Sequence, residues 1–465
     1  MKRRLALASV AALSFTASLR PWGSGYLAVV AFAAAVAAVR GERRPARAAA
    51  LMAVAWLGLA VPALEGTFLS VWWSLPALVA LNSVAWAVAG AAHAFAANRG
   101  GGSTLWLLPL LVVAAEFVAS RRWLWGDAAF SLLAYTQADT PLRYLASLTG
   151  SSGPALGVAL AGGALVALVT GPRWTAGALL VSIATLSLAA YVVPAGTDAG
   201  SVRVAVVQSA QGQVARLLMP FDEGLMARVV APYVALTAEA AAAGAELVVW
   251  GETVLPEGSA AVEEPWVNAL RAAPAVVAGR VERAVDGLYN SVFAWRGDGL
   301  ELVSRKQALV PVVEAVYAAG EPSEPFSVQG ARLAALVCLD SLHGELSRES
   351  VRRGADLLVY LTDDTFAGRT ATPLLHLRTA ILRAAETGRA VVFANESGPS
   401  AIVSPTGKVL ALSRAREAGV VITDVPLMRG STPYVAFGDW LGTLALSAVL
   451  AVLALTARRP PCDVS

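Results

Sequence analysis

The chain has 465 residues, of which 57% are hydrophobic and only 15% carry a charge. This balance excludes an ordinary soluble globular protein and predicts a membrane protein. The formal net charge of +3 is small and the basic residues are scattered along the chain, so the sequence predicts no nucleic-acid partner.

The N-terminal part is the most apolar, because only 19 charged residues lie among the first 199. A helix needs about 20 apolar residues to cross a bilayer. Runs that approach this length predict eight spans, near residues 5–19, 25–39, 49–64, 71–97, 104–119, 154–170, 174–193 and 437–456. We therefore expect a membrane domain of about seven helices over residues 1–197, and a further span with a cytoplasmic tail over residues 433–465. The first run, which follows the basic segment MKRR, also fits a signal peptide.

Basic residues next to the spans predict the orientation, because Lys and Arg near span ends stay in the cytoplasm. The basic positions at 2–4, 40–47, 99, 173 and 458–459 all fall on one side if every run crosses the membrane. Arg121 and Arg122 break this pattern unless their segment lies along the interface, with Trp123 and Trp125 as anchors. The polar segment 198–432 then lies on the other side, in the periplasm of a bacterium whose inner membrane holds the chain.

The polar segment has the pattern of an α/β domain. The stretches VRVAVVQSA and AELVVWGE are short and rich in β-branched residues, and a helical stretch over residues 223–244 lies between them. Similar strand-like runs follow, with helical stretches at residues 346–353 and 373–387 among them. Strands that alternate with helices predict one layered α/β domain over residues 198–432.

Three of the predicted strands end next to residues that can carry out chemistry. Glu252 follows one strand in WGETVLP, Lys306 lies in RKQALVP, and Cys338 ends another strand in VCLD. Binding groups in open α/β sheets collect at the carboxyl ends of strands. We therefore expect these three side chains to meet.

The lysine is informative because the chain holds only three, at positions 2, 306 and 408. Lysine is a compact charge with a pKa that moves readily, whereas arginine stays charged and is larger. Lys306 is therefore a candidate for a role that arginine cannot fill. An ordinary surface lysine is the alternative interpretation.

Cys338 has three possible roles. A buried small apolar residue is the ordinary one. A disulfide would have to join it to Cys462, which is expected on the opposite face of the membrane. The third role is a nucleophile, which needs a nearby cation to form a thiolate at neutral pH. Lys306 is the candidate cation, and Glu252 is the candidate base that removes the thiol proton.

Histidines offer a weaker alternative for activating the cysteine. His343 is the one histidine near Cys338 in sequence, whereas His93 lies in a predicted span and His376 is expected to pack on a helix face. The Cys and His residues have no metal-ligand spacing, and no glycine-rich loop has the P-loop or dinucleotide pattern. We therefore expect neither a metal nor a cofactor.

The order Glu, Lys, Cys in these motifs resembles the nitrilase superfamily, whose αββα sandwich uses a Glu-Lys-Cys triad to form a thioester. Two further segments resemble one membrane family, apolipoprotein N-acyltransferase. They are RRWLWGDAAFSLLAYTQADTPLRYLASLTGSSGPALG, which is similar to its periplasmic loop, and STPYVAFGDW, which is similar to the entry into its last span. The resemblance implies a multi-span helical membrane domain joined to a nitrilase-like αββα domain.

The resemblance also implies the reaction. Cys338 would take a fatty acyl chain from a phospholipid, typically phosphatidylethanolamine, and pass it to the N-terminal amine of a diacylglyceryl-cysteine lipoprotein. Lys306 and the backbone N–H of Leu339 would stabilise the oxyanion, and Glu314 would support the triad unless it is an ordinary solvated acid. The chain is expected to act as a monomer.

This sequence departs from the family pattern at several positions. Leu339 and Asp340 replace Tyr and Glu, Val312 and Val313 replace Phe and Gly, Thr365 replaces Trp, and ANESG replaces Thr-Asn-Thr-Gly. We expect these positions to surround the mouth of the pocket and to affect the choice of acceptor. Two alternatives stay open, namely a membrane-tethered amidase or hydrolase with the same triad, and a non-catalytic lipid- or lipoprotein-binding homologue.

Overall fold

The computed structural model describes residues 1–20, 23–70, 74–100, 104–121, 132–171, 173–192, 196–212, 223–255, 264–297, 299–311 and 313–460. The chain divides into two compact units. The helical unit comprises residues 1–193, 369–375 and 437–465, and the sheet unit comprises residues 194–368 and 376–436.

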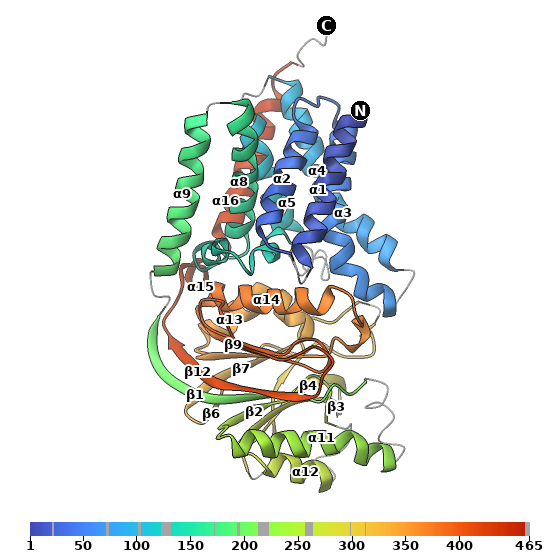
Figure 1. The fold of residues 1–465 in the computed structure, drawn as a ribbon, viewed down its shortest axis with the longest axis vertical. Helices are drawn as coiled ribbons and strands as arrows, with labels where there is room; N and C mark the ends of the chain where they lie inside the picture. Colours follow the sequence, from blue (N-terminus) through green and yellow to red (C-terminus); the bar gives the residue numbers. More distant parts are fainter. Residues whose placement is uncertain are drawn as a thin grey trace. The chain divides into compact units, whose positions relative to one another are not determined.

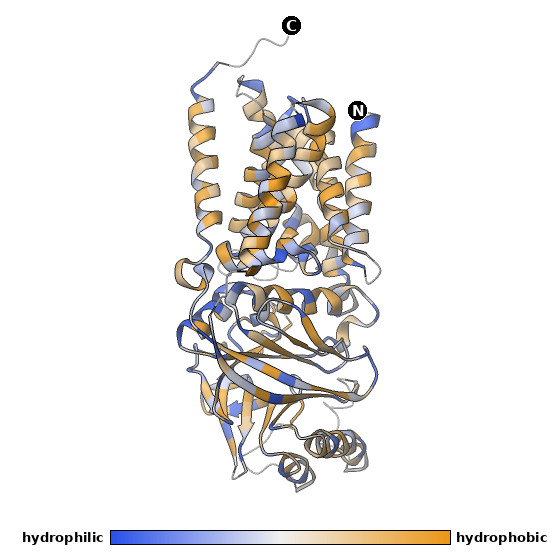
Figure 2. Ribbon diagram, turned by 60° about the vertical axis from the view of Figure 1, so that its left-hand side comes forward, coloured by the Kyte–Doolittle hydropathy of each residue, from blue (hydrophilic) through white to orange (hydrophobic). Residues whose placement is uncertain are grey.

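Apolar helices form the helical unit. They are α1 (Lys2–Leu19), α2 (Tyr26–Val39), α3 (Pro45–Ser70), α4 (Ser74–Asn98), α5 (Leu107–Ala119), α7 (Ala146–Thr149), α8 (Ser152–Thr170), α9 (Arg173–Val192) and α16 (Trp440–Ala457), with the short 3₁₀ turns η1 (Thr104–Trp106), η3 (Leu133–Gln137) and η4 (Pro141–Leu145). Figure 2 shows apolar residues on several sides of these helices, as expected for helices that lie in lipid.

Five helices are long and apolar enough to cross a membrane, namely Pro45–Gly66, Pro76–Asn98, Ser152–Thr170, Arg173–Val192 and Trp440–Ala457. They coincide with five of the eight expected spans. The other three spans correspond to α1, which begins with three basic residues, and to α2 and α5, which are shorter apolar helices of 14 and 13 residues. The structure thus describes an apolar helix at every expected span.

An aromatic cluster fixes the first helices to each other. The indole of Trp86 in α4 lies 5.7 Å from the ring of Phe15, 5.9 Å from Phe32 and 4.7 Å from Trp56, measured between ring centroids. The Trp86 N–H donates to the carboxyl group of Glu116 at 3.2 Å. The buried indole donor therefore has the partner that an apolar environment requires.

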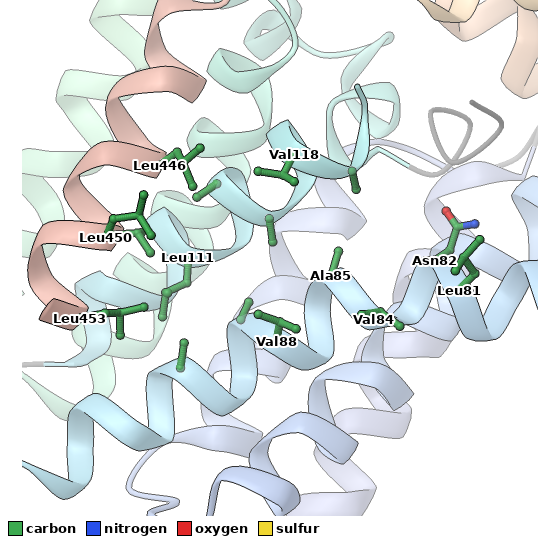
Figure 3. Close-up of a pocket in the computed structure, with 16 residues that line it drawn as sticks. Leu81, Asn82, Val84, Ala85, Val88, Leu111, Val118, Leu446, Leu450 and Leu453 are labelled. Carbon is green, nitrogen blue, oxygen red and sulfur yellow. The ribbon is translucent and has the colours of Figure 1, made fainter. Parts of the chain in front are cut away.

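Two apolar grooves lie between helices of this unit. Figure 3 shows the first, where Val88 of α4, Leu111 and Val118 of α5, and Leu446 and Leu450 of α16 line a groove of about 330 Å³. The second, of about 620 Å³, lies between α2, η4, α8 and α9. Grooves with such linings suit hydrocarbon chains better than polar ligands.

The sheet unit contains two six-stranded sheets. The first has the order β12 (Gly419–Arg429), β1 (Thr197–Gln208), β2 (Leu247–Val249), β3 (Val276–Ala284), β4 (Gly287–Trp295) and β5 (Leu300–Arg305). The second has the order β11 (Val409–Leu412), β10 (Ala401–Val403), β9 (Ala390–Asn395), β8 (Leu357–Thr362), β7 (Ala331–Val337) and β6 (Phe326–Val328). β1, β2 and β3 are parallel to one another, and so are β7, β8 and β9.

Side-chain alternation in the strands produces the layers. In β1, Val202, Val204 and Val206 belong to the core between the two sheets, whereas Ala205 and Val207 belong to a second core beneath helices. A strand covered on both faces in this way reads as a continuous apolar run. The period of two along the strand therefore gives each sheet one face toward the other sheet and one toward helices.

Helices cover the outer faces of both sheets. α11 (Glu223–Ala242) and α12 (Glu264–Arg271) pack on the first sheet, and α13 (Gly344–Arg352) and α14 (Thr372–Thr387) lie beside the second (Figure 1). The short elements η6 (Cys338–Leu342), η7 (Thr365–Ala367) and α15 (Pro433–Phe437) complete the unit. The layer order is helix, sheet, sheet, helix, so the predicted fold class, an αββα sandwich domain together with a helical membrane domain, is confirmed.

Candidate active site

The candidate residues lie at the ends of strands, as the sequence predicted. Glu252 follows β2 by three positions, Lys306 follows β5 directly, and Cys338 follows β7 directly. β2 and β7 are buried up to their last residues, so the chain leaves the sheet just before Glu252 and Cys338, and β5 becomes buried only near its end, before Lys306. Side chains from both sheets therefore meet at one edge of the sandwich.

Lys306 lies between two carboxylates. Its ammonium nitrogen donates to Glu314 Oε1 at 2.7 Å and to Glu252 Oε1 at 3.2 Å. The lysine is only 1% exposed, so both contacts are shielded from water. Glu314 is held in turn, because its Oε2 accepts from the backbone N–H of Val310 at 2.7 Å. The structure thus brings the expected lysine and both expected glutamates into one buried cluster.

Cys338 occupies a strained turn. Its φ of 48° lies in the left-handed region, which costs a residue with a side chain about 1–2 kcal/mol. The residue directly follows β7 and begins η6, and its thiol is free. Strain of this kind persists only where the surrounding contacts hold it, and it is common at functional sites. Cys462, its only possible disulfide partner in the chain, lies outside the described residues.

The charges around Cys338 favour the neutral thiol in the resting site. Burial raises the pKa of Cys338 well above its ordinary value, the nearby Glu252 raises it further, and Lys306 lowers it only in part. The prediction that Lys306 would produce a thiolate at neutral pH is therefore wrong. Burial lowers the pKa of Lys306, but Cys338, Glu252 and Glu314 together raise it well above its usual value, so the ammonium stays charged.

Glu252 has the properties of a base. Burial raises the pKa of its carboxyl group, and the charge of Glu314 adds to this, while Lys306 and a hydrogen bond from Asn290 act in the opposite direction. The amide of Asn290, in β4, donates to Glu252 Oε1 at 2.7 Å. A carboxylate with a raised pKa accepts a proton more readily than an exposed one. Asn290 is a site residue that the sequence did not indicate.

Asp340 joins the two loops of the site. It is fully buried and its carboxylate accepts from the backbone N–H groups of Gln307, Ala308 and Val337. Burial raises its pKa to about 6, although these hydrogen bonds act against the rise, so the group is ionised at neutral pH. One carboxylate thereby holds the segment after Lys306 against the turn of Cys338.

His376, and not His343, contacts the peptide of the nucleophile. The Nε2 atom of His376 lies 3.3 Å from the carbonyl oxygen of Cys338 and 2.9 Å from Ser341 Oγ. Its Nδ1 atom lies 3.1 Å from a carboxylate oxygen of Asp364. The prediction that His376 merely packs on a helix face is wrong, whereas His343 is buried with its Nδ1 4.0 Å from Glu345.

Comparisons with known proteins identify the family of this chain. The family described as carbon-nitrogen hydrolase matches residues 203–432, and the N-terminal domain of apolipoprotein N-acyltransferase matches residues 11–164. The apolipoprotein N-acyltransferase of Gloeobacter violaceus is 29% identical over 499 residues, which cover 95% of this chain and 91% of the relative. The chain belongs to the apolipoprotein N-acyltransferase family. The resemblance seen in the motifs is confirmed, and with it the prediction of an acyltransferase with a carbon-nitrogen hydrolase domain.

Other relatives of this chain include the apolipoprotein N-acyltransferase of Shewanella oneidensis. It is 27% identical over 418 residues, which cover 81% of this chain and 77% of the relative. Among solved structures, an amidase from Nesterenkonia sp. is 21% identical and is matched with a TM-score of 0.38 over 52% of this chain and 95% of the amidase.

Several positions at which this chain departs from the family pattern are buried. Leu339 is 2% exposed, and Asp340 and Glu396 are fully buried, so the expectation that these positions surround the pocket mouth is wrong for all three. Val313 is 51% exposed and Thr365 is half-buried, which is compatible with a place at the surface. Val312 lies outside the described residues.

Proposed function

We propose that this protein transfers a fatty acyl chain from a phospholipid, typically phosphatidylethanolamine, to the N-terminal amine of a diacylglyceryl-cysteine lipoprotein. In the first step the sulfur of Cys338 attacks the ester carbonyl of the phospholipid. The ester C–O bond breaks, the lysophospholipid leaves, and a thioester remains on Cys338. In the second step the amine attacks the thioester, the C–S bond breaks, and the thiol forms again with an amide as the product.

Glu252 moves the protons in both steps. It takes the thiol proton as sulfur attacks, which fits the neutral thiol and the raised pKa of the glutamate. It then gives this proton to the leaving alkoxide of the lysophospholipid. In the second step Glu252 takes a proton from the attacking N-terminal amine and returns a proton to the sulfur of Cys338. Glu252 therefore serves as the base in both half-reactions, because in each one it gives back the proton that it has taken up.

Lys306 and the backbone N–H of Leu339 stabilise the oxyanion of each tetrahedral intermediate. Leu339 is the second residue of η6, and the first N–H groups of a helix have no partner inside it. The ammonium of Lys306 is fixed by two glutamates, so it does not have to reorganise as charge develops. A preorganised donor of this kind contributes about 2.7–4 kcal/mol.

Exposed apolar side chains support a lipid substrate. Val313 and Val316, on the segment that carries Glu314, are 51% and 71% exposed, and Phe366 is 37% exposed just after β8. A soluble amidase has no need for such residues next to its catalytic edge. The apolar helices of the same chain hold the enzyme in the membrane that contains both substrates, which raises their effective concentration at the site.

The observation that carries the proposal is the buried contact of Lys306 with Glu252 and Glu314, at the edge where Cys338 follows β7. It occurs in a chain that also has helices suited to a membrane. We further infer that the chain lies in the bacterial inner membrane with residues 198–432 in the periplasm, on the basis of the basic residues that flank its spans.

Intact-protein mass spectrometry tests the proposal. Wild type and Cys338→Ala are incubated in detergent micelles with phosphatidylethanolamine, and then with a synthetic diacylglyceryl-cysteine peptide. We expect the wild type to gain the mass of one acyl chain, to lose it with hydroxylamine, and to pass it to the peptide amine. Release of the chain as free fatty acid, with none on the peptide, would identify a hydrolase instead. No mass gain by a folded wild type would overturn the proposal.

A further inference from the structure

Behind the nucleophile turn lies a buried chain of polar side chains that the proposed reaction does not use. His376, near the start of α14, contacts the carbonyl oxygen of Cys338 through Nε2 and contacts Asp364, just after β8, through Nδ1. Ser341 donates to the same carbonyl oxygen at 2.8 Å. His376, Ser341 and Asp364 are at most 1% exposed. Substrate therefore does not reach them directly.

We propose that His376, supported by Asp364, is a positioning residue that orients the peptide between Cys338 and Leu339 and so aims the oxyanion-stabilising N–H of Leu339. The inference rests on the proposed function, in which this N–H binds the oxyanion. His376 acts on the backbone and not on the substrate, because its contact is with the carbonyl oxygen of Cys338.

The planarity of the peptide bond links the two groups. The carbonyl of Cys338 and the N–H of Leu339 belong to one peptide unit, and in a trans peptide they point in opposite directions. The structure contains no cis peptide bond among the described residues. Holding the carbonyl oxygen from one side therefore fixes the direction of the N–H on the other side. Hydrogen bonds to a carbonyl also polarise the peptide and strengthen its N–H as a donor.

The turn at Cys338 is strained, and contacts to its carbonyl oxygen hold the peptide that follows it. With a φ of 48° the residue occupies a region that L-residues avoid. A flip of the Cys338–Leu339 peptide would leave this φ unchanged, but it would rotate ψ of Cys338 and turn the Leu339 N–H away from the oxyanion. Contacts from Ser341 and His376 to the carbonyl oxygen oppose that rotation.

His376 is itself held by Asp364 and Phe393. The Asp364 carboxylate and the Cys338 carbonyl oxygen both accept only, so each contact requires a proton on the ring nitrogen that makes it, Nδ1 toward Asp364 and Nε2 toward the turn. The amide of Asn395, at the end of β9, donates to Asp364 Oδ2 at 2.6 Å. The ring of Phe393 meets the imidazole edge-on, with the ring centroids 5.2 Å apart. The imidazole therefore has one orientation, which a positioning role requires.

Two substitutions at His376 separate this role from simple space filling. In His376→Gln the amide reaches the position of Nε2 and keeps a donor for the Cys338 carbonyl. In His376→Asn the shorter amide reaches only the position of Nδ1 and keeps the contact with Asp364. We expect His376→Asn to form the acyl-enzyme from phosphatidylethanolamine at least tenfold more slowly, since full loss of an oxyanion donor costs about 10²–10³ in rate. His376→Gln should keep most of the rate, and neither should change the KM for the phospholipid.

Alkylation of Cys338 by iodoacetamide provides the control, because this reaction has no oxyanion. Both variants should alkylate at the wild-type rate, and their thermal unfolding midpoints should be similar to each other. Ser341→Ala, which removes the other donor to the same carbonyl, should slow acylation in the same direction without slowing alkylation.

A folded His376→Asn that acylates as fast as wild type would overturn the inference. So would equal losses of acylation and alkylation, because they would mean that the thiol itself has moved. If His376→Asn does not fold, Ser341→Ala decides by the same two measurements. A wild type that alkylates but forms no acyl-enzyme would instead refute the proposed function.

Discussion

The carboxylate of Asp340 accepts a hydrogen bond from the backbone N–H of Ala308 at 2.6 Å. Asp340 lies two residues after the nucleophile and Ala308 two residues after the lysine, so this contact fixes the distance between two loops of the site. The same carboxylate accepts from Gln307 and Val337. A buried acid with three backbone donors is a rigid connection, because each donor is fixed in the main chain.

We therefore predict that Asp340→Asn lowers both stability and activity. The asparagine amide presents two donors where the site already has donors, so at least one backbone N–H loses its acceptor. The loss should be about 1.5–3 kcal/mol in the free energy of unfolding, as for a hydrogen bond to a charged group. Acyl-enzyme formation should slow as well, because the Lys306 loop is no longer held against Cys338.

Asp356→Asn provides the matched control. Asp356 is also buried and also accepts from a backbone N–H, that of Arg332, but it precedes β8 and lies at the other end of the strand from the site. This variant should unfold at a lower temperature and still acylate at the wild-type rate once folded. Equal acylation rates in the two asparagine variants would contradict the bridging role of Asp340.

Lys306→Arg should be inactive although it keeps the charge. The lysine is 1% exposed and fits between Glu252 and Glu314, and a planar guanidinium is too large for the same place. Because the cation would no longer lie where the oxyanion forms, the rate should fall by about 10²–10³. Acylation kinetics would measure this, with Lys408→Arg at an exposed turn as the control that should act as wild type. A Lys306→Arg enzyme with near-wild-type turnover would exclude the proposed role.

The pH dependence of acylation should reveal the ionisation of Glu252. The base must be ionised to accept the thiol proton, so the rate falls as the pH drops through the pKa of Glu252. Burial raises this pKa above its ordinary value, whereas the hydrogen bond from Asn290 lowers it. Asn290→Ala removes only the lowering effect. The acid limb of the pH–rate profile should therefore move to higher pH in this variant.

Ser291→Ala controls for the loss of a side chain from the same strand. Ser291 follows Asn290 in β4, and its hydroxyl donates to Glu282 at 2.7 Å instead of to Glu252. The acid limb of the pH–rate profile of Ser291→Ala should coincide with that of wild type. A limb that stays in place in Asn290→Ala, or moves to lower pH, would mean that another group is the base.

The sequence predicted the parts of the site that lie at strand ends. Continuous apolar runs predict where β2 and β7 end, and Glu252 and Cys338 follow these ends within three residues. Lys306 was predicted in a loop-like segment, and it directly follows β5. The helix over 223–244 was also predicted from its pattern, and α11 occupies Glu223–Ala242. The pattern of apolar residues along the chain indicates which residues face a core, and this is sufficient to place a residue at the edge of a sheet.

Periodicity does not report which side chain across the fold accepts a hydrogen bond. Asp340 and His376 act through contacts with residues 32 to 38 positions away, in other elements. Asp340 lies in a short 3₁₀ turn with no pattern of its own, and His376 lies on an amphipathic helix where an apolar environment was the simplest interpretation. The sign of the pKa shift at Cys338 was also missed, because burial depends on the whole fold and here exceeds the effect of the single cation.

The close approach of Gly251 and Glu396 gives a last prediction, which concerns the departure in ANESG. Glu396 is fully buried, and its Oε2 accepts from the hydroxyls of Ser209 at 2.7 Å and Tyr233 at 2.8 Å. A Cβ on Gly251 would lie only 2.7 Å from Glu396 Oε1 and 2.8 Å from its Cγ. Gly251→Ala should therefore displace Glu252, the next residue, and slow acylation, at an overpacking cost of about 1–3 kcal/mol.

The double variant tests whether Glu396 is the cause of this constraint. Glu396→Thr shortens the side chain and removes the atoms that an alanine at position 251 would meet. Gly251→Ala should then cost less in the Glu396→Thr background than in wild type, with a coupling energy of about 0.5–3 kcal/mol in unfolding measurements. The acylation rate should recover in parallel. Additive losses would mean that the glycine is needed for its contact with another part of the fold.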